Sequence, residues 1–493
     1  MQFSELTKYL TDAHRVGDGD AQVTGITYDS REVKPGWLFV AIKGASFDGH
    51  RFIDSAIKAG AAAIIAERKP DHIDIPCVVV PDGRYAMGEI AAPFFGYPTR
   101  KMKLVGVTGT SGKTTVTHLI NSIFNAAGYC AGLIGTLGAR AGDEFVETLH
   151  TTPESVDLQR MFATMADKGV NVAAIEASSH GLFQGRTLGC EFDCGVFTNI
   201  ARDHLDFHGS VESYLDAKLI LFRDYPSKSD KPFAAVVNAD DPAAKQVIAA
   251  CPGAITFAVE AGADLTASNI EVTDRAVRFD MTYSGQSAPI KLGIGGFFNV
   301  YNALAAGAAA IALGLDLDAV ERGLASARQV PGRFESVDCG QDFGVIVDYA
   351  HTPDELENVL RTAGNLASNR LIVTFGCGGD RDRGKRPIMG RIAAQLADLL
   401  VVTSDNPRTE DPESIIAEIM TGISDKDRAR ATLQPDRREG IRAAIELADS
   451  GDVVVIAGKG HEDYQIFADR TIHFDDREVA REVLQCSRSR PEK

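Results

Sequence analysis

The stretch that decides the fold is KLVGVTGTSGKTT, residues 103–115. Its first part is apolar and predicts the end of a buried strand, and the segment TGTSG that follows predicts a tight turn. Lys113 then begins a predicted helix, which continues with apolar residues at helical spacing from Val116 to Ile123. A strand, a tight turn and a helix N-terminus bind phosphate groups through converging backbone N–H groups and the helix dipole.

Two side chains add to this phosphate-loop interpretation. Lys113 would supply positive charge, and the hydroxyl of Thr114 could ligate Mg²⁺. The strict phosphate-loop pattern would place glycine at position 107, where this chain has valine. A chance GKT at the start of an ordinary helix is the alternative. It is less favoured because strand, turn and helix all fall where phosphate binding needs them.

Length and charge limit the remaining possibilities. A chain of 493 residues is too long for a single core, so we expect about two to four domains. The 51 basic and 68 acidic residues give a net charge of −17, which argues against nonspecific binding to nucleic acid or to a membrane surface. We find neither a signal-peptide pattern nor an apolar run of about 18 residues, so we expect no membrane insertion. Eight cysteines without CxxC spacing predict reduced thiols in a cytoplasmic protein.

Strand and turn patterns predict an α/β protein of three domains. Residues 1–98 read as a small α/β unit with strands near 61–65 and 77–80, and a linker follows around Pro93 and residues 97–99. Within this unit, the loops at 29–31 and 43–50 carry much of the polar chemistry, although on spacing alone they read as surface loops. Residues 99–330 alternate strands and helices, which predicts a central phosphate-loop ATPase domain with a mostly parallel sheet.

Residues 331–493 form the third predicted domain, a Rossmann-like α/β unit. Its strands are expected at 344–347, 371–375, 399–403 and 452–456, and the loops that follow them are 348–351, 376–385, 405–408 and 458–462. Loops that follow parallel strands gather at one edge of the sheet. The four loops are therefore predicted to form a cleft.

Polar residues at strand ends in the central segment suggest a metal site. The expected strand at 170–175 ends at Glu176, and His204 and His208 follow the strand at 195–198. Two histidines four residues apart on a helix could bind zinc together with Asp203 or Asp206. Gly209 and the lack of a sustained apolar face favour a loop there instead. A hard-metal site of Glu176, His204 and oxygen ligands is preferred.

Lys218 lies in YLDAKLILF, among apolar residues at helical spacing. One interpretation is a lysine whose chain covers apolar surface and whose ammonium group reaches water, and periodicity alone favours it. The other is a lysine desolvated beside metals, with a lowered pKa and a reactive neutral amine. The pattern does not decide between them.

Together these segments resemble the Mur ligases, ATP-dependent amino-acid ligases of cell-wall precursor synthesis. The resemblance covers nearly the whole chain, and it accounts for Val107 because the phosphate loop of the family lacks the first glycine of the strict pattern. The matching motifs, in order, are DSREVKPGWLFVAIKG, TGTSGKTT, TTPE, EASSHGL, NIARDHLDFHG, YLDAK, GFFNVYNALAA, PGRFE, DYAHTP, GCGGDRDRGKRP, DNPR and AGKGHE. Within the family, the match is to members that add the third amino acid to UDP-N-acetylmuramoyl-L-alanyl-D-glutamate.

The resemblance implies a role for each matching residue. ATP would be held by Gly109, Thr110, Ser111, Gly112, Lys113, Thr114 and Thr115, with Asn302 at the adenine and Arg333 and Asp348 at the ribose and phosphates. Mg²⁺ would be held by Thr114, Glu176, His204 and Lys218, the last as a carbamate formed with CO₂. The UDP-muramyl dipeptide would contact Ser30, Thr151, Thr152, Ser178, Gln184 and Arg186, and the uracil pocket around residues 43–50 is left open. Meso-diaminopimelate would be bound by Arg381, Asp405, Asn406, Pro407, Arg408, Gly458 and Glu462.

The implied reaction proceeds through an acyl phosphate on the D-glutamate γ-carboxylate, which the incoming amine then attacks. We expect a monomer. The alternatives are the lysine-adding ligase, the dipeptide-adding muramyl ligase, a folylpolyglutamate synthase, or a nucleotide-binding switch without ligase activity. Arg408 argues against the lysine-adding version, whose members lack this arginine. The set Glu176, His204 and Lys218 argues against a simple switch, because a nucleotide binder needs no second metal site.

Overall fold

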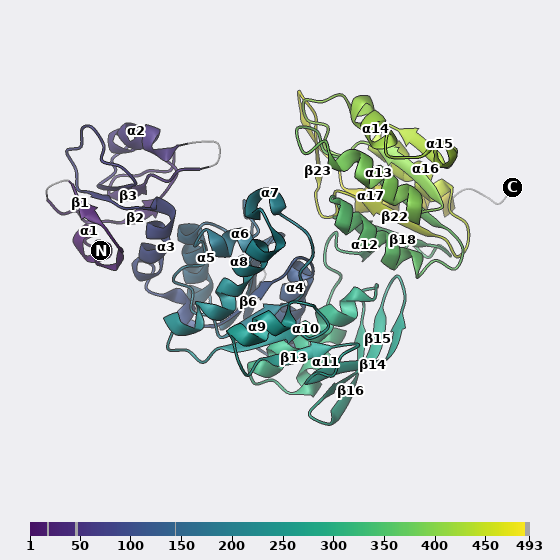
Figure 1. Cartoon of the computed structure of the whole chain (residues 1–493), viewed down its shortest axis with the longest axis horizontal. Coiled ribbons are helices and arrows are strands. Elements are labelled where there is room, and N and C mark those ends of the chain that lie inside the picture. The colour runs from purple at the N-terminus through teal and green to yellow at the C-terminus, as the bar shows by residue number, and fades with distance from the viewer. Residues whose placement is uncertain (17–18, 45–47, 143, 489–493) are drawn as a thin grey trace. The chain divides into compact units, whose positions relative to one another are not determined.

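A computed structural model describes residues 1–16, 19–44, 48–142 and 144–488 (Figure 1). The chain divides into two compact units. The first unit contains Met1–Asp264 and Ala305–Val320, and the second contains Leu265–Leu304 and Glu321–Lys493. Both are α/β, as the sequence predicts. No helix among the described residues is long and apolar enough to cross a membrane.

The N-terminal part of the first unit is a small sheet in the order β1-β5-β4-β3-β2. Its strands are β1 (His14–Arg15), β2 (Gly25–Thr27), β3 (Trp37–Val40), β4 (Ala63–Ala66) and β5 (Cys77–Val79). The strands predicted near 61–65 and 77–80 are β4 and β5, with ends displaced by one or two residues. The helices of this part are α1 (Phe3–Leu6), α2 (Ile53–Lys58) and α3 (Gly83–Phe94).

A larger sheet of the first unit runs in the order β13-β12-β11-β6-β10-β7-β8-β9. Its strands are β6 (Lys103–Thr108), β7 (Ala131–Gly135), β8 (Gly138–Ala141), β9 (Glu144–Val146), β10 (Val172–Glu176), β11 (Cys194–Phe197), β12 (Ala234–Asn238) and β13 (Ile255–Ala258). From β13 to β7 the neighbours are parallel, and β8 and β9 add antiparallel edge strands. The helices are α4 (Lys113–Ala126), α5 (Ser155–Asp167), α6 (Ser179–Phe183), α7 (Leu205–His208), α8 (Val211–Arg223) and α9 (Ala244–Ala250).

Strand β6 brings the phosphate loop to the middle of this sheet. Val107 is fully buried and pairs with Glu176 of β10 on one side and with Val196 of β11 on the other. Position 107 is therefore part of the strand, and the turn begins after Thr108. Since the flanking strands are parallel to β6, their carboxyl ends lie at the same edge as the loop.

The second unit contains an antiparallel meander and a parallel sheet. The meander is β14 (Leu265–Val272), β15 (Val277–Tyr283) and β16 (Gln286–Leu292). The sequence prediction of strand–helix alternation throughout 99–330 is wrong for this segment. The helices of the second unit are α12 (Pro353–Gly364), α13 (Lys385–Leu396), α14 (Pro412–Met420), α15 (Asp425–Arg428), α16 (Arg437–Glu446) and α17 (Asp476–Arg488). Two further helices, α10 (Phe298–Ala312) and α11 (Leu317–Ala325), each begin in one unit and end in the other.

The parallel sheet of the second unit has the order β17-β18-β22-β19-β20-β21. The strands are β17 (Glu335–Ser336), β18 (Gly344–Asp348), β19 (Leu371–Phe375), β20 (Leu399–Thr403), β21 (Ala431–Gln434) and β22 (Val453–Ala457), and a separate hairpin pairs β23 (Tyr464–Ile466) with β24 (Thr471–His473). The four predicted strands are β18, β19, β20 and β22, all parallel. Their following loops therefore share one edge of the sheet, as expected.

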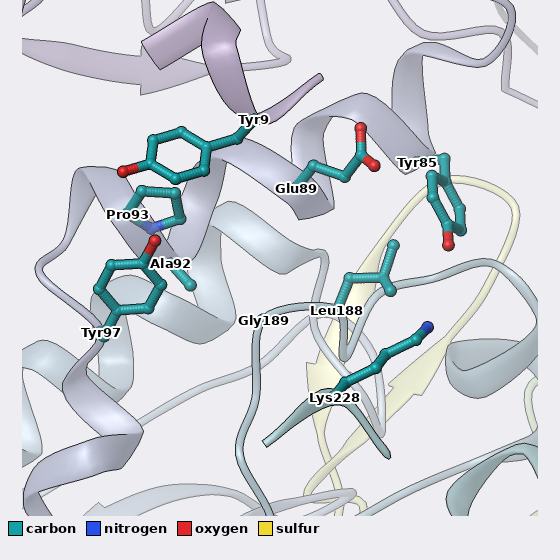
Figure 2. Close-up of a pocket in the computed structure, with 9 residues that line it drawn as sticks. All are labelled: Tyr9, Tyr85, Glu89, Ala92, Pro93, Tyr97, Leu188, Gly189 and Lys228. Carbon is teal, nitrogen blue, oxygen red and sulfur yellow. The ribbon is translucent and has the colours of Figure 1, made fainter. Parts of the chain in front are cut away.

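A shallow cavity of about 250 Å³ lies in the first unit (Figure 2). Figure 2 shows tyrosine rings, a proline and a leucine around it, with the Lys228 side chain at one side. Its lining is Tyr9, Tyr85, Glu89, Ala92, Pro93, Tyr97, Leu188, Gly189 and Lys228. None of the site residues predicted from the sequence lines this cavity, so the candidate site lies elsewhere.

Candidate active site

The phosphate loop is held in a shape that depends on glycine. Gly109 and Gly112 have φ of 150° and 88°, which L side chains rarely adopt. A Cβ on Gly109 would also lie 1.9 Å from the Thr198 hydroxyl oxygen. The loop is fixed to the segment after β11: Thr110 and Ser111 donate their backbone N–H groups to the Asn199 carbonyl and side-chain oxygens, each at 2.9 Å. Thr198 and Asn199 thus shape the loop from a distant part of the sequence.

Lys113 and Lys218 meet at one carbonyl oxygen of this loop. The Lys113 ammonium donates to the carbonyls of Gly109 at 2.9 Å and Thr110 at 2.8 Å. The Lys218 Nζ, on α8, donates to the same Gly109 oxygen at 2.7 Å. Lys218 is 1% exposed, so the interpretation with its ammonium group in water is wrong. Burial, with the nearby charge of Lys113, lowers the pKa of Lys218 well below its ordinary value.

The aromatic ring of Tyr214 packs against the ammonium group of Lys218. Its ring centroid is 4.1 Å from the Lys218 Nζ, and its hydroxyl lies 3.3 Å from the hydroxyl of Thr110. The ring of His208 packs against it at 5.2 Å between centroids. Tyr214 was not predicted as a site residue, because its helical spacing resembles that of an ordinary core residue.

Glu176 lies at the end of β10, where its carboxylate is almost completely buried and accepts several hydrogen bonds. The donors are the Thr114 hydroxyl at 3.0 Å, the Thr136 backbone N–H at 2.8 Å and the Thr136 hydroxyl at 3.1 Å. Gly135 makes room for the carboxylate, since a Cβ there would lie 2.2 Å from Glu176 Oε1. A threonine hydroxyl beside a carboxylate is a hard-oxygen donor set, which suits Mg²⁺.

His204 lies immediately before α7 with a left-handed φ of 52°. Residues 205–208 form this short helix, so the expectation of a loop there is wrong. The His204 ring packs against His180 at 4.8 Å between centroids, and its Nε2 is 3.3 Å from Asp203. Among the residues that the structure describes, no group of three or more His, Cys, Asp and Glu side chains is placed to hold a metal ion. The histidine and aspartate side chains of the zinc hypothesis are therefore not placed together around a metal position. The magnesium hypothesis is not tested in this way, because two of its ligands are Thr114 and modified Lys218.

The residues predicted to contact the UDP-muramyl dipeptide lie mainly in one hydrogen-bonded network. The Thr152 hydroxyl donates to the Glu176 carbonyl at 2.7 Å and lies 2.8 Å from the Ser178 hydroxyl. Arg186 donates to the Thr152 carbonyl at 3.0 Å. The Thr151 hydroxyl lies 3.1 Å from that of Thr136, which extends the network to the Glu176 carboxylate.

Other members of this predicted set differ in their surroundings. The buried side-chain oxygen of Gln184 has no hydrogen-bond partner among the described residues, as expected of a group that binds a ligand. Ser30 lies in the turn after β2. Glu154 was missed by the sequence predictions, although it lies within 3.3 Å of Arg186 and 3.1 Å of Arg84 and so orients both. Of the loop at 43–50, residues 45–47 lie outside the described part of the chain.

In the second unit, the loop at 405–408 lies beside the loop at 458–462. The Asn406 amide donates to Glu462 Oε2 at 2.9 Å, and a Cβ on Gly458 would lie 2.6 Å from the Asp405 carboxylate. Arg408 has a left-handed φ of 53° and donates to the Gly379 carbonyl at 2.8 Å. Buried Pro407 precedes it.

Arg381 is the outlying member of this set. It is exposed, and its guanidinium donates a long hydrogen bond of 3.4 Å to the Asp380 carbonyl. A Cβ built on Gly378 would nevertheless lie 2.9 Å from Arg408 Nη1 and 3.7 Å from Arg381 Cγ. The two arginines therefore flank Gly378, with no side chain between them there.

The residues of the second unit that are predicted to contact the nucleotide also have contacts within the protein. Asp348 accepts the backbone N–H groups of Phe334 at 2.7 Å and Ala350 at 2.8 Å, and burial raises the pKa of its carboxyl to about 6. The Arg333 guanidinium lies over the Tyr349 ring, 5.0 Å from its centroid. The Asn302 amide donates to the Asn299 side chain at 2.7 Å.

Comparison with known proteins assigns the chain to one family. Residues 22–95 match the family model "Mur ligase family, catalytic domain", residues 107–310 match "Mur ligase middle domain", and residues 332–460 match "Mur ligase, glutamate ligase domain". The UDP-N-acetylmuramoyl-L-alanyl-D-glutamate–2,6-diaminopimelate ligase of Geobacillus thermodenitrificans is 48% identical over 476 residues, which are 96% of each chain. The enzyme of that name from Syntrophomonas wolfei is 46% identical over 487 residues, 98% of this chain and 99% of the relative.

Solved structures are similar as well. A structure of a UDP-N-acetylmuramoyl-L-alanyl-D-glutamate–2,6-diaminopimelate ligase aligns with a TM-score of 0.70 and 35% identity, over 99% of this chain and all of the other. MurF ligase from Thermotoga maritima, solved in complex with ADP, aligns with a TM-score of 0.64 and 21% identity over 94% and 97% of the two chains. The second likeness concerns the fold alone.

Proposed function

This chain belongs to the Mur ligase family, and we propose that it is the ligase that joins meso-2,6-diaminopimelate to the D-glutamate of UDP-N-acetylmuramoyl-L-alanyl-D-glutamate. The observation that carries the proposal is the identity of 48% over almost the full length to a ligase of that name. ATP would drive the reaction, which supplies a peptidoglycan precursor. We also infer a cytoplasmic monomer with domain boundaries near residues 98 and 330.

ATP is needed because a carboxylate is a poor electrophile at neutral pH. The D-glutamate γ-carboxylate oxygen attacks the γ-phosphorus, the bond to the β-phosphate oxygen breaks, and ADP leaves an acyl phosphate behind. The approach brings two anions together, and the Lys113 ammonium at the start of α4 would offset that charge. The loop at 109–115 would hold the phosphates through its backbone N–H groups and the N-terminus of α4. The neutral amine then attacks the acyl carbon, a C–N bond forms, the nitrogen gives up one proton, and the C–O bond to phosphate breaks so that phosphate leaves.

Mg²⁺, when bound by Thr114, Glu176, His204 and carbamylated Lys218, would stabilise the negative charge that develops between the two reacting groups. The hydrogen bond from Thr114 to Glu176 supports this set, because it places two hard oxygen donors side by side. For Lys218, the buried amine with a lowered pKa supports carbamylation. The ammonium would first lose one proton, the neutral nitrogen would attack CO₂ to form a C–N bond while one C–O π bond opens onto oxygen, and the nitrogen would lose a second proton, so that the cation becomes an anion.

Recognition of diaminopimelate would use the loops of the second unit. Its distal carboxylate calls for a planar bidentate donor, a role suited to Arg408, while Arg381 would hold the other carboxylate. Glu462 and the Gly458 carbonyl would accept hydrogen bonds from the distal ammonium. Lysine lacks the distal carboxylate, so it would leave Arg408 without a carboxylate partner and should be a poor substrate.

The test is phosphate release from ATP with UDP-muramyl dipeptide and, in turn, diaminopimelate, lysine and D-alanyl-D-alanine. We expect release with diaminopimelate, little with lysine, and none in a folded Lys113→Ala protein, because the γ-phosphate loses its main cation. Equal use of lysine would overturn the proposed substrate. Near-normal activity of folded Lys113→Ala would overturn the assignment of the ATP site.

A further inference from the structure

Lys459 is a completely buried lysine in the second unit, in the loop that follows β22. Its ammonium has three hydrogens and finds three acceptors: the Tyr464 carbonyl at 2.6 Å, Asn406 Oδ1 at 2.9 Å and Glu462 Oε2 at 3.3 Å. A buried ammonium is costly unless it is paired and hydrogen-bonded in this way. The three acceptors come from the loop at 405–408, the loop at 458–462 and strand β23, so Lys459 links all three segments.

The two side-chain acceptors are both residues for which diaminopimelate contact is proposed. Asn406 Oδ1 also accepts the Ile466 backbone N–H at 3.0 Å, and its amide donates to Glu462 Oε2 at 2.9 Å. Glu462 Oε2 therefore receives Lys459 and Asn406 together. No described residue donates a hydrogen bond to Oε1 of the same carboxylate. The carboxylate is thus oriented with one oxygen engaged by the protein and the other left to a ligand.

Strand β23 connects the contacts of Lys459 to Arg408 through backbone hydrogen bonds. The Arg408 backbone N–H donates to the Ile466 carbonyl at 3.0 Å, and the Gln465 amide donates to the Asp405 carbonyl at 2.7 Å. The backbone of the loop at 405–408 is therefore fixed on β23. Any movement of β23 relative to Asn406 would also move the arginine proposed to read the distal carboxylate.

We propose that Lys459 is a positioning residue for the amino-acid substrate: it fixes Asn406, the orientation of Glu462 and, through β23, the backbone of Arg408. The inference rests on the proposed function, because it takes diaminopimelate as the molecule that these loops bind. Lys459 itself touches no substrate in this account. It sets Glu462 Oε1 as the oxygen that meets the distal ammonium.

The test compares Lys459→Met with Arg370→Met, a control for lost stability. Arg370 bonds the buried Asp452 carboxylate at 2.6 Å, and both residues directly precede strands β19 and β22, at the sheet edge opposite Lys459. Each variant leaves a half-buried or buried carboxylate without its cation. We expect Lys459→Met to raise the KM for diaminopimelate by about tenfold or more, since three acceptors lose a donor. The KM values for ATP and UDP-muramyl dipeptide should be unchanged, and Arg370→Met should leave all three unchanged.

A second measurement does not depend on activity. The Ile466 amide should exchange its hydrogen faster in Lys459→Met than in the wild type or in Arg370→Met, because Asn406 Oδ1 loses its fixed position. An unchanged diaminopimelate KM, or equal KM changes in both variants, would overturn the inference. If Lys459→Met does not fold, Lys459→Gln, which retains a donor, replaces it; failure of both to fold would assign Lys459 to stability alone and also overturn the inference. Wild-type enzyme that cannot use diaminopimelate would instead refute the proposed function.

Discussion

Gly135→Ala adds one methyl group at the end of β7 and tests the role of Glu176 without altering the carboxylate itself. The new Cβ would lie 2.2 Å from Glu176 Oε1 and 2.8 Å from its Cγ and Cδ. Restoring ordinary contact at 3.4 Å requires the carboxylate oxygen to move by roughly 1.2 Å. Such a movement breaks the 2.8 Å hydrogen bond from Thr136 N–H and displaces the oxygen that Thr114 meets.

We expect this displacement to reduce kcat by about a hundredfold, the effect that a 1 Å misplacement within a catalytic site can have. The free energy of unfolding should fall by about 1–3 kcal/mol, as for other overpacked sites. Phosphate release at saturating substrates measures the first effect, a Mg²⁺ titration shows whether metal affinity falls with it, and thermal unfolding measures the second. Gly262→Ala is the matched control, since the φ of that glycine lies outside the left-handed range and no atom lies within 4 Å of its Cβ position.

Comparing the change in kcat with the change in stability shows whether the Glu176 carboxylate acts in catalysis or only in packing. A Gly135→Ala protein with normal kcat and normal Mg²⁺ dependence, but with lowered stability, would show that Glu176 only fills the core. That result would refute the proposed metal ligand. A loss of activity equal to that of Gly262→Ala would refute the geometric reasoning.

Three further changes have defined outcomes. Lys218→Ala should be almost inactive and partly restored by a short carboxylic acid at high concentration, since the proposed role is a negative charge; equal wild-type activity in CO₂-depleted and bicarbonate-supplemented buffer, with no mass shift at Lys218, would contradict carbamylation. Arg408→Ala should lower kcat/KM for diaminopimelate by a factor that corresponds to about 2–5 kcal/mol of lost transition-state stabilisation, while the KM values for ATP and UDP-muramyl dipeptide stay the same. An unchanged preference for diaminopimelate over lysine would contradict the specificity argument. His461→Phe should make the protein less sensitive to acid: burial lowers the pKa of His461 from 6.5 to about 4, so the native state binds fewer protons than the unfolded state in that window and loses stability as pH falls through it. Melting temperatures of both proteins between pH 7 and pH 4 measure this, and parallel curves would contradict it.

Local patterns were enough to predict the strands that hold the site. The strand predicted at 371–375 is β19, with the same bounds, and the helix expected at Lys113 is α4. Fold class could also be predicted, because buried parallel strands appear as short apolar runs followed by polar loops. The meander at 265–292 was missed although a signal exists: Ala288, Ile290 and Leu292 are buried and alternate with exposed residues, which is typical of a half-buried antiparallel strand.

Contacts between distant segments could not be predicted. Lys218 and Gly109 are 109 positions apart, and helical periodicity places the lysine on a partly apolar face without saying what covers it. Lys459 was not singled out, since a lysine between glycines gives no indication of burial. Glu154 was likewise visible only as the last residue of TTPE, while its pairing with Arg84 depends on the packing of α3 near α5. Such positions follow from tertiary structure alone.

The carbonyl of Gly109, shared by two lysines, has a consequence for the proposed binding of nucleotide. The Lys113 ammonium donates to two main-chain oxygens of the loop. A phosphate group that binds Lys113 as proposed would displace these oxygens. The ammonium would exchange one kind of acceptor for another, so only the difference between phosphate and carbonyl would contribute to affinity. Once Lys113 turns to phosphate, the Gly109 oxygen has Lys218 as its remaining lysine donor. Occupancy of the proposed ATP site would thereby be linked to the surroundings of Lys218 through a single oxygen atom.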